Sequence, residues 1–169
     1  MKYMILFLIA TPLFAQRITL DSIPRASRPL FIHAVLYAVP GLGYEPNTVK
    51  DVPFKLTPGF TVNENAGFTI EGDSITILYD GDYLTHFVCA FSGATSTDWH
   101  FSMFKNFSTE GVSAHSYNTT TGAGNYTAVS WFNYYHFAAG DVLCWKVTNI
   151  TNNFDPLIHA IKWYIEKAY

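Results

Sequence analysis

Residues 82–91 constrain the fold most, because an extended chain here is apolar on both of its faces. The stretch follows the turn Asp80-Gly81-Asp82 and contains no Pro, Lys, Arg or Glu. Side chains of a strand alternate between two faces, and aromatic and β-branched residues favour strands. We therefore predict a strand with Tyr83, Thr85, Phe87, Cys89 and Phe91 on one face and Leu84, His86, Val88 and Ala90 on the other.

The rest of the chain predicts further strands and almost no helix to cover the second apolar face of that strand. About eight short strands are expected, with turns at Pro58-Gly59, 63–67 and Gly72-Asp73 between them. Leu157–Tyr169 also fits a helix, but its β-branched and aromatic content favours a strand. The sequence thus predicts an all-β, two-sheet antiparallel sandwich with strands near 30–39, 68–71, 74–79, 82–91, 99–104, 127–137, 142–148 and 157–165, and at most short strands at 52–56 and 112–117.

The expected strands fall into two groups. Those that start at Leu30, Asp82, Thr127 and Leu157 are apolar on both faces, whereas those that start at Phe68, Trp99 and Val142 are apolar on one. In a two-sheet sandwich, a strand with one apolar face belongs to a sheet whose outward face is exposed to solvent. The other sheet needs a cover, and another subunit is the simplest one.

Composition agrees with a single β domain that buries surface against partners. The 169 residues suffice for a sizeable core, 17% of them are aromatic and only 14% are charged. The net charge is −3 and no cluster of Lys and Arg occurs, so nucleic-acid binding is not expected. The two cysteines, Cys89 and Cys144, are expected to be free thiols, with Cys144 on an outward face.

Residues 1–28 are expected to form a signal peptide or an N-terminal anchoring arm, followed by one domain over 29–169. Met1–Gln16 has one early positive charge, a short apolar run and a small residue at Ala15, which is the pattern of a signal peptide. The run is too short to span a membrane. A retained arm that packs on another subunit remains the alternative, so cleavage of residues 1–15 stays open.

Several short motifs in the domain occur in the order of a known superfamily. They are Phe31-Ile32-His33-Ala34, Val52-Pro53-Phe54, Asn65-Ala66-Gly67-Phe68, Gly81-Asp82-Tyr83, Phe104-Lys105-Asn106 and Ala138-Ala139-Gly140-Asp141-Val142. With them the chain resembles the tumour-necrosis-factor-like jelly rolls, and most of all their complement globular-head branch. It departs from them at Phe107 and in Ile161–Ile165, where the family has a Gly. No ligand site of the family transfers.

The resemblance implies a homotrimer, because the inner sheet of this family packs around a threefold axis. We therefore expect the trimer interface to include Leu84, His86, Val88, Tyr134 and His136. Near a threefold axis each histidine occurs three times, an arrangement able to bind a metal or to weaken the trimer at acidic pH. The simpler interpretation is that these histidines are hydrogen-bonded interface residues.

No pattern of an enzyme site is present. Asp98-Trp99-His100 contains residue types of a metalloenzyme site, but Asp98 and His100 share the parity opposite Trp99, which is expected in the core with Trp145. No nucleophile elbow, phosphate loop or spaced metal ligands occur. We expect no catalytic, cofactor-binding or metal residues and no cofactor.

The sequence thus predicts a non-enzymatic trimeric structural or adhesive module, outside the cell or on a virus particle such as a phage fibre, spike or decoration protein. Its expected partners are copies of itself, with other virion or cell-surface proteins as further candidates. The alternative is a secreted protein that binds a receptor or a glycan through loops 93–98 and 108–126. A metal-dependent jelly-roll enzyme is the weakest of the three hypotheses.

Overall fold

The structure is a computed structural model that describes residues 32–39, 43–94, 96–107, 109–119 and 126–168, with 109–119 as backbone only. Residues 1–28, for which a signal peptide or arm is predicted, lie outside the described residues. The described part contains no helix, as the sequence predicts. Its eleven strands are β1 His33–Ala38, β2 Phe54–Lys55, β3 Thr61–Ala66, β4 Phe68–Glu71, β5 Ser74–Ile77, β6 Gly81–Ser92, β7 Asp98–Lys105, β8 Thr109–Thr119, β9 Thr127–Phe137, β10 Val142–Asn149 and β11 Leu157–Lys167.

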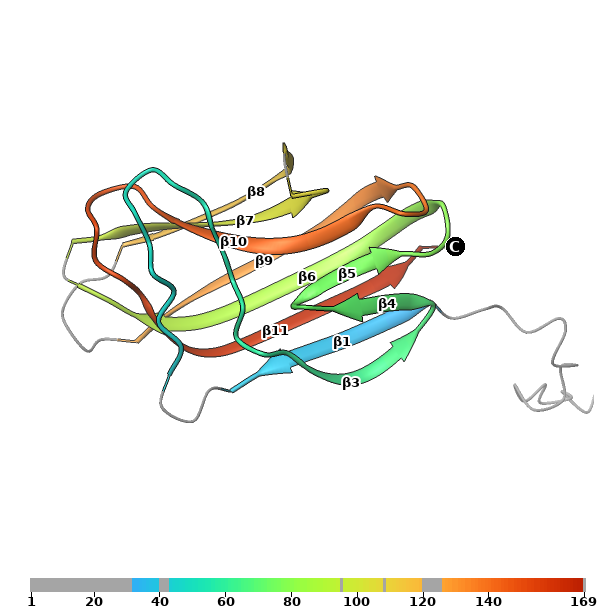
Figure 1. Cartoon of the computed structure of the whole chain (residues 1–169), viewed down its shortest axis with the longest axis horizontal. Helices are drawn as coiled ribbons and strands as arrows, with labels where there is room; N and C mark the ends of the chain where they lie inside the picture. Colours follow the sequence, from blue (N-terminus) through green and yellow to red (C-terminus); the bar gives the residue numbers. More distant parts are fainter. Residues whose placement is uncertain (1–31, 40–42, 95, 108, 120–125, 169) are drawn as a thin grey trace, which may run out of the picture. The chain divides into compact units, whose positions relative to one another are not determined.

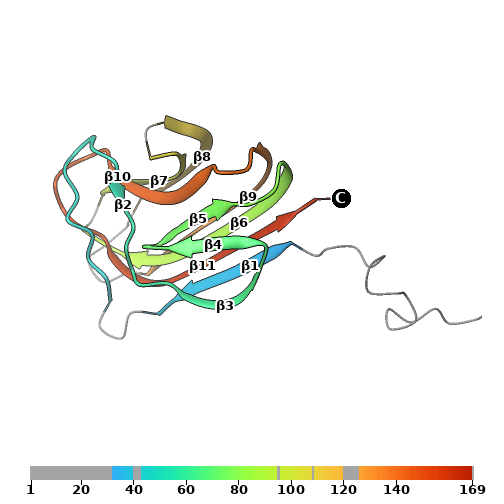
Figure 2. The same cartoon turned by 45° about the vertical axis from the view of Figure 1, so that its right-hand side comes forward.

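The strands form two antiparallel sheets, which confirms the predicted fold class. One sheet has five strands in the order β3-β1-β11-β6-β9, and the other has β4-β5-β10-β7-β8 with β2 paired to β10. Figure 1 shows β3, β1, β11 and β6 side by side, and Figure 2 shows β7, β8 and β10 in the second layer. β6 lies between β11 and β9, so the strand with two apolar faces is internal to its sheet.

The odd-numbered residues of β6 build the core, as predicted. Tyr83, Phe87, Cys89 and Phe91 are all fully buried. The ring of Phe87 stacks on that of Trp145 in β10, with centroids 3.8 Å apart and planes at 19°. This pair joins the two sheets at the centre of the sandwich.

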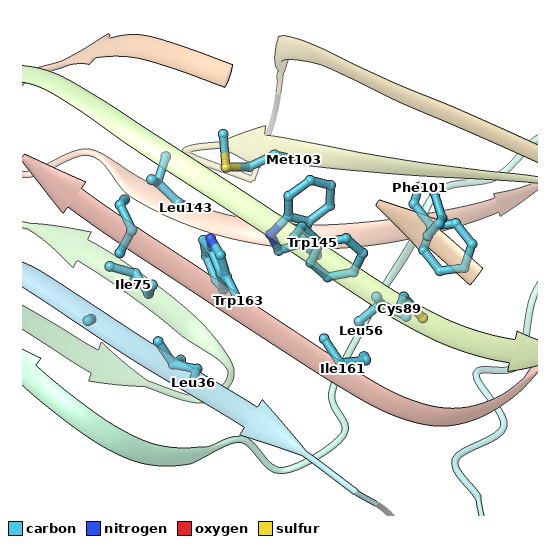
Figure 3. Packing of buried hydrophobic residues seen from close by; sticks show 14 of the residues in the cluster. Leu36, Leu56, Ile75, Cys89, Phe101, Met103, Leu143, Trp145, Ile161 and Trp163 are labelled. Carbon is cyan, nitrogen blue, oxygen red and sulfur yellow. The ribbon is translucent and has the colours of Figure 1, made fainter. Parts of the chain in front are cut away.

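The space between the sheets is filled by large aromatic and aliphatic side chains. Trp99 and Trp145 are buried, which confirms that both are core residues. Figure 3 shows Trp145 and Trp163 close together in this space, and their rings meet edge to face with centroids 6.2 Å apart. Interiors of this kind are packed as tightly as organic crystals, so the two sheets have little freedom to shift.

The prediction of a turn over residues 63–67 is wrong, because β3 runs through Ala66. β3 pairs with the edge of β1, with Val35 opposite Glu64. Its side chains Thr61–Asn65 are exposed, so no alternation of apolar and polar residues marks it. Its stability comes from backbone hydrogen bonds to a neighbouring strand, which side-chain patterns do not reveal.

The outward face of the six-stranded sheet is less exposed to solvent than the sequence predicts. Cys144 points outward from β10, as expected, yet it is fully buried, and Phe104 beside it is 7% exposed. The Lys146 ammonium lies 3.9 Å from the centroid of the Phe104 ring and covers it. Burial raises the pKa of the Cys144 thiol, and the charges of Lys55 and Lys146 offset part of that rise. Both cysteines are free thiols, as predicted.

Two of the sequence motifs meet at the carboxylate of Asp141, in the turn between β9 and β10. Asn106 donates from Nδ2 to Oδ1 of Asp141 at 3.0 Å, and the amide of Ala138 donates to Oδ2 at 2.9 Å. The Lys105 ammonium lies 3.4 Å from Oδ2. Val142 donates its amide proton to Oδ1 of Asn106 at 2.8 Å. These contacts bind the end of β7 to the start of β10.

The buried hydrogen bond between Trp163 and Thr85 should contribute measurably to stability. The indole Nε1–H donates to Oγ1 of Thr85 at 3.0 Å, and both residues are fully buried. Thr85→Val removes the acceptor at almost constant volume, so the free energy of unfolding should fall by about 1–3 kcal/mol. Urea unfolding measures it, with Thr69→Val on the exposed face of β4 as the control. Equal stabilities of the two variants would contradict this account.

Asp141 should make stability depend on pH. Burial alone raises the pKa of its carboxyl, but hydrogen bonds from Ala138 and Asn106 and the charge of Lys105 bring the pKa below its usual value. A depressed folded-state pKa stabilises the fold above the unfolded pKa of about 4 and less as the pH falls below it. Asp141→Asn should cost about 2 kcal/mol near pH 7 and much less near pH 2.

Urea unfolding at several pH values checks this prediction. The exposed Asp51→Asn serves as the control and should leave the pH profile unchanged. A constant loss in Asp141→Asn across the whole range would show that the charge of Asp141 is not what matters.

Candidate functional site

The outward side of the five-stranded sheet carries aromatic and aliphatic side chains and is the main candidate for function. We call it the open face and define it by eight outward residues of β6, β9, β11 and β1, which are Val35, Tyr37, Leu84, His86, Val88, Phe132, Tyr134 and Tyr164; the outward Ser130 and Lys162 flank Val88 on the same side. They alternate along their strands with core residues such as Phe87, Phe137 and Trp163. The strict alternation of strand side chains therefore creates this face as a by-product of building the core.

The row of side chains through His86 crosses the whole sheet. His86 pairs with Phe132 on β9 and with Tyr164 on β11. Tyr164 in turn pairs with Val35, and Val35 with Glu64 on the edge strand β3. The row thus changes from aromatic at the β9 edge to acidic at the β3 edge.

The aromatic side chains at the β9 edge are open to solvent. Phe132 is 60% exposed and Tyr134 is 57% exposed. Both rings lie near each other, with centroids 6.2 Å apart at 78°. Exposed aromatic groups that gather on one face of a domain indicate a contact surface.

Polar side chains flank these apolar residues, and the exposed Lys162 lies among them, between Val88 and Tyr37. At one end His136 Nδ1 lies 2.8 Å from Oδ1 of Asp82, and both side chains are 70% exposed. At the other end His33 Nε2 lies 3.1 Å from Oε2 of Glu64. An apolar centre with a polar rim is the usual arrangement of a protein interface.

A small acidic pocket of about 260 Å³ lies on the β1–β3 side of the open face, lined by His33, Glu64, Tyr164 and Glu166. The Tyr164 hydroxyl donates to Oε2 of Glu166. Burial, the hydrogen bond to Glu166 and the charges of Glu166 and Glu64 together raise the pKa of Tyr164 to about 12, with burial the largest cause. Tyr164 is therefore a neutral hydrogen-bond donor here.

All five predicted interface residues lie on the open face or at its end. Leu84, His86 and Val88 are half-buried, while Tyr134 and His136 are exposed. His86 Nε2 lies 3.2 Å from Oγ of Ser130, and its ring meets Phe132 edge to face at 6.1 Å. The histidines thus have ordinary polar and aromatic neighbours within the subunit.

Three aromatic residues of the open face, Phe132, Tyr164 and Tyr37, are absent from the predicted set. Phe132 shares the even parity of Tyr134, so the alternation along β9 is the signal that identifies it. Tyr164 and Tyr37 depend on the pairing of β11 with β1, where Tyr37 faces Lys162. The register of two distant strands is required to place them.

Asp98 and His100, the candidates for a metalloenzyme site, belong to no metal-binding group among the described residues. His100 Nε2 lies 3.1 Å from Oγ of Ser102, on the side of β7 opposite the buried Trp99. Among the residues that the structure describes, no three His, Cys, Asp or Glu side chains come together in a way that can hold a metal ion. In the same described part, no helix is long and apolar enough to cross a membrane.

Solved structures share this arrangement of strands. Murine APRIL at pH 8.0 has a TM-score of 0.51 and 16% identity, and the match covers 80% of this chain and 99% of that one. The Eiger TNF of S. frugiperda has a TM-score of 0.50 and 13% identity, over 82% of this chain and 93% of that one. The fold is that of the tumour-necrosis-factor-like jelly rolls. No family model and no curated protein sequence matches the chain.

The carboxylate of Glu166 should control the ionisation of Tyr164. In Glu166→Gln the negative charge is lost, so the pKa of Tyr164 should fall from about 12 towards its ordinary value, while burial keeps it partly raised. A titration of ¹³C-labelled tyrosine by NMR measures this, with the resonance assigned through Tyr164→Phe. Glu45→Gln, at an exposed position, is the control. An unchanged pKa in Glu166→Gln would mean that burial alone raises it.

Proposed function

We propose that this chain is a non-enzymatic module that assembles as a homotrimer through the open face. The supporting observation is the row of aromatic and aliphatic side chains on a sheet that no other element of the described chain covers, with Phe132 60% and Tyr134 57% exposed. Contact with another protein surface removes such side chains from water, which stabilises the assembly by about 25 cal/mol per Å² of buried apolar surface. The resemblance to tumour-necrosis-factor-like proteins supports a threefold arrangement.

The two ends of the open face differ, and a cyclic assembly can bring them together. Phe132 and Tyr134 lie at the β9 edge, whereas His33, Glu64 and Glu166 lie towards the β3 edge. In a ring, the contact joins two different patches of the subunit. A ring therefore places the aromatic end of one subunit against the partly polar end of the next one.

The module's role is structural or adhesive, outside the cell or on a virus particle, where it serves as a fibre, spike or decoration. The expected signal peptide or anchoring arm over residues 1–28 supports this location. A secreted protein that recognises a receptor or glycan is the second candidate. A particle component keeps Met1, whereas a secreted binder begins near Gln16, so the mass of the native chain distinguishes them.

Val88→Asp should dissociate the trimer and leave the fold intact. Val88 lies on the open face, opposite Lys162 on the neighbouring strand β11. Within one subunit the new carboxylate pairs with the Lys162 ammonium. In a buried contact between subunits the carboxylate loses its hydration, and the free energy of that loss exceeds what the ion pair returns. We expect assembly at least about 100-fold weaker, which corresponds to roughly 3 kcal/mol.

Native mass spectrometry gives the number of subunits, and circular dichroism with thermal unfolding reports the fold. Thr69→Asp makes a similar change at an exposed position of the other sheet and should remain a trimer. The proposal is wrong if the unmodified chain is a monomer at micromolar concentration, or if Val88→Asp remains a trimer.

A further inference from the structure

A second pocket, of about 460 Å³, opens on the outward side of the six-stranded sheet. Ser74 and Thr76 of β5 line it, since they alternate with the core residues Ile75 and Ile77. Val142 of β10 lies opposite Thr76 in the register of the sheet. The pocket is therefore built on regular strands, and its volume is within the range of roughly 300–1,000 Å³ typical of small-molecule sites.

The hydroxyl of Ser74 is the strongest sign of a ligand. Ser74 is only 5% exposed, and its Oγ has no hydrogen-bond partner among the described residues. A buried hydroxyl without a partner costs roughly 1–3 kcal/mol. Ser74 lines the pocket, but its Oγ atom has almost no accessible surface of its own, so a bound polar group can remove this cost only after a small rearrangement of the pocket wall.

Further donors and acceptors line the same pocket. The Lys55 ammonium donates to the carbonyl oxygen of Gly72, which holds it at the pocket wall. Glu71, which pairs with Ser74 across β4 and β5, adds a carboxylate, and Thr76 adds a hydroxyl. The single positive and single negative charge of the lining cancel, so the site suits a neutral ligand with many hydroxyl groups.

Phe107 supplies an apolar wall. Its side chain is 50% exposed, and the Lys55 ammonium lies 5.4 Å from its ring centroid. The carbonyl oxygen of Phe107 accepts a hydrogen bond from Lys146 at 3.0 Å. The neighbouring Asn106 is fixed by Asp141, so the loop that carries Phe107 is held at two points.

We infer that this pocket binds one monosaccharide unit of a glycan, with an apolar face of the sugar ring on Phe107 and its hydroxyl groups on Ser74, Thr76 and Glu71. A sugar ring combines a C–H face with hydroxyls that both donate and accept, and the lining offers both kinds of partner. The pocket and the open face belong to different sheets, so this site goes beyond the proposed trimer and does not depend on it.

Saturation-transfer NMR tests the inference with D-galactose, D-mannose, N-acetyl-D-glucosamine and L-fucose, each added separately to the full chain. At least one of these sugars should give a signal. Its affinity should fall at least about tenfold in Phe107→Ala and in Ser74→Ala, and Phe107→Tyr, which keeps the ring, should retain it. Phe154→Ala removes a similarly exposed aromatic side chain elsewhere, 61% exposed, and should have no effect.

The assembly variant separates this inference from the proposed function. Val88→Asp should bind the sugar as the unmodified chain does, whatever its number of subunits, and loss of binding there would overturn a site contained in one subunit. The inference is also overturned if none of the four sugars gives a signal, or if Phe107→Ala and Ser74→Ala bind as tightly as Phe154→Ala.

Discussion

The stacking of Phe87 on Trp145 is the contact on which the rest of the structure depends. It joins β6, an internal strand of the five-stranded sheet, to β10, the middle strand of the other sheet, with ring centroids 3.8 Å apart. Trp131 and Trp163 meet the same indole edge to face at 5.5 and 6.2 Å, so one ring gathers side chains from three strands of the opposite sheet. Fixing Phe87 in the core also fixes the parity of β6. His86 and Val88 then have no place except the open face.

The two outward sides of the sandwich consequently have different properties. On the six-stranded sheet the chain covers part of its own surface, since Lys146 lies over Phe104 and Cys144 is buried. On the five-stranded sheet the described chain supplies no such cover, and Phe132 and Tyr134 remain in water. A broad apolar face suits another protein, whereas a compact pocket with hydroxyls suits a small polar ligand. One fold thus carries two separate surfaces for which we propose different binding partners.

Alternation along single strands predicts much of this architecture, and contacts between distant strands limit the rest. The parity of β6 alone assigns Phe87 to the core and Leu84 to the open face. The sequence does not predict β3, because its exposed polar residues are held by backbone pairing. The sequence does not predict the pocket either, because Ser74, Lys55 and Phe107 come from three segments that no local pattern connects. The Asp141 contacts are intermediate, since both motifs are recognisable in the sequence but their meeting is not.

The asymmetry of the open face bears on how copies of the chain associate. A twofold contact through this face is isologous, so a contact between its two different ends occurs twice, once from each subunit. In the cyclic contact that we propose, Phe132 and Tyr134 cover the apolar parts of Val35 and Tyr37 while the acidic side chains stay at the rim. Charges at a rim keep most of their hydration, whereas charges buried in a contact lose it at a cost of several kcal/mol. Desolvation therefore favours any arrangement of subunits that leaves the carboxylates near Glu64 at the rim.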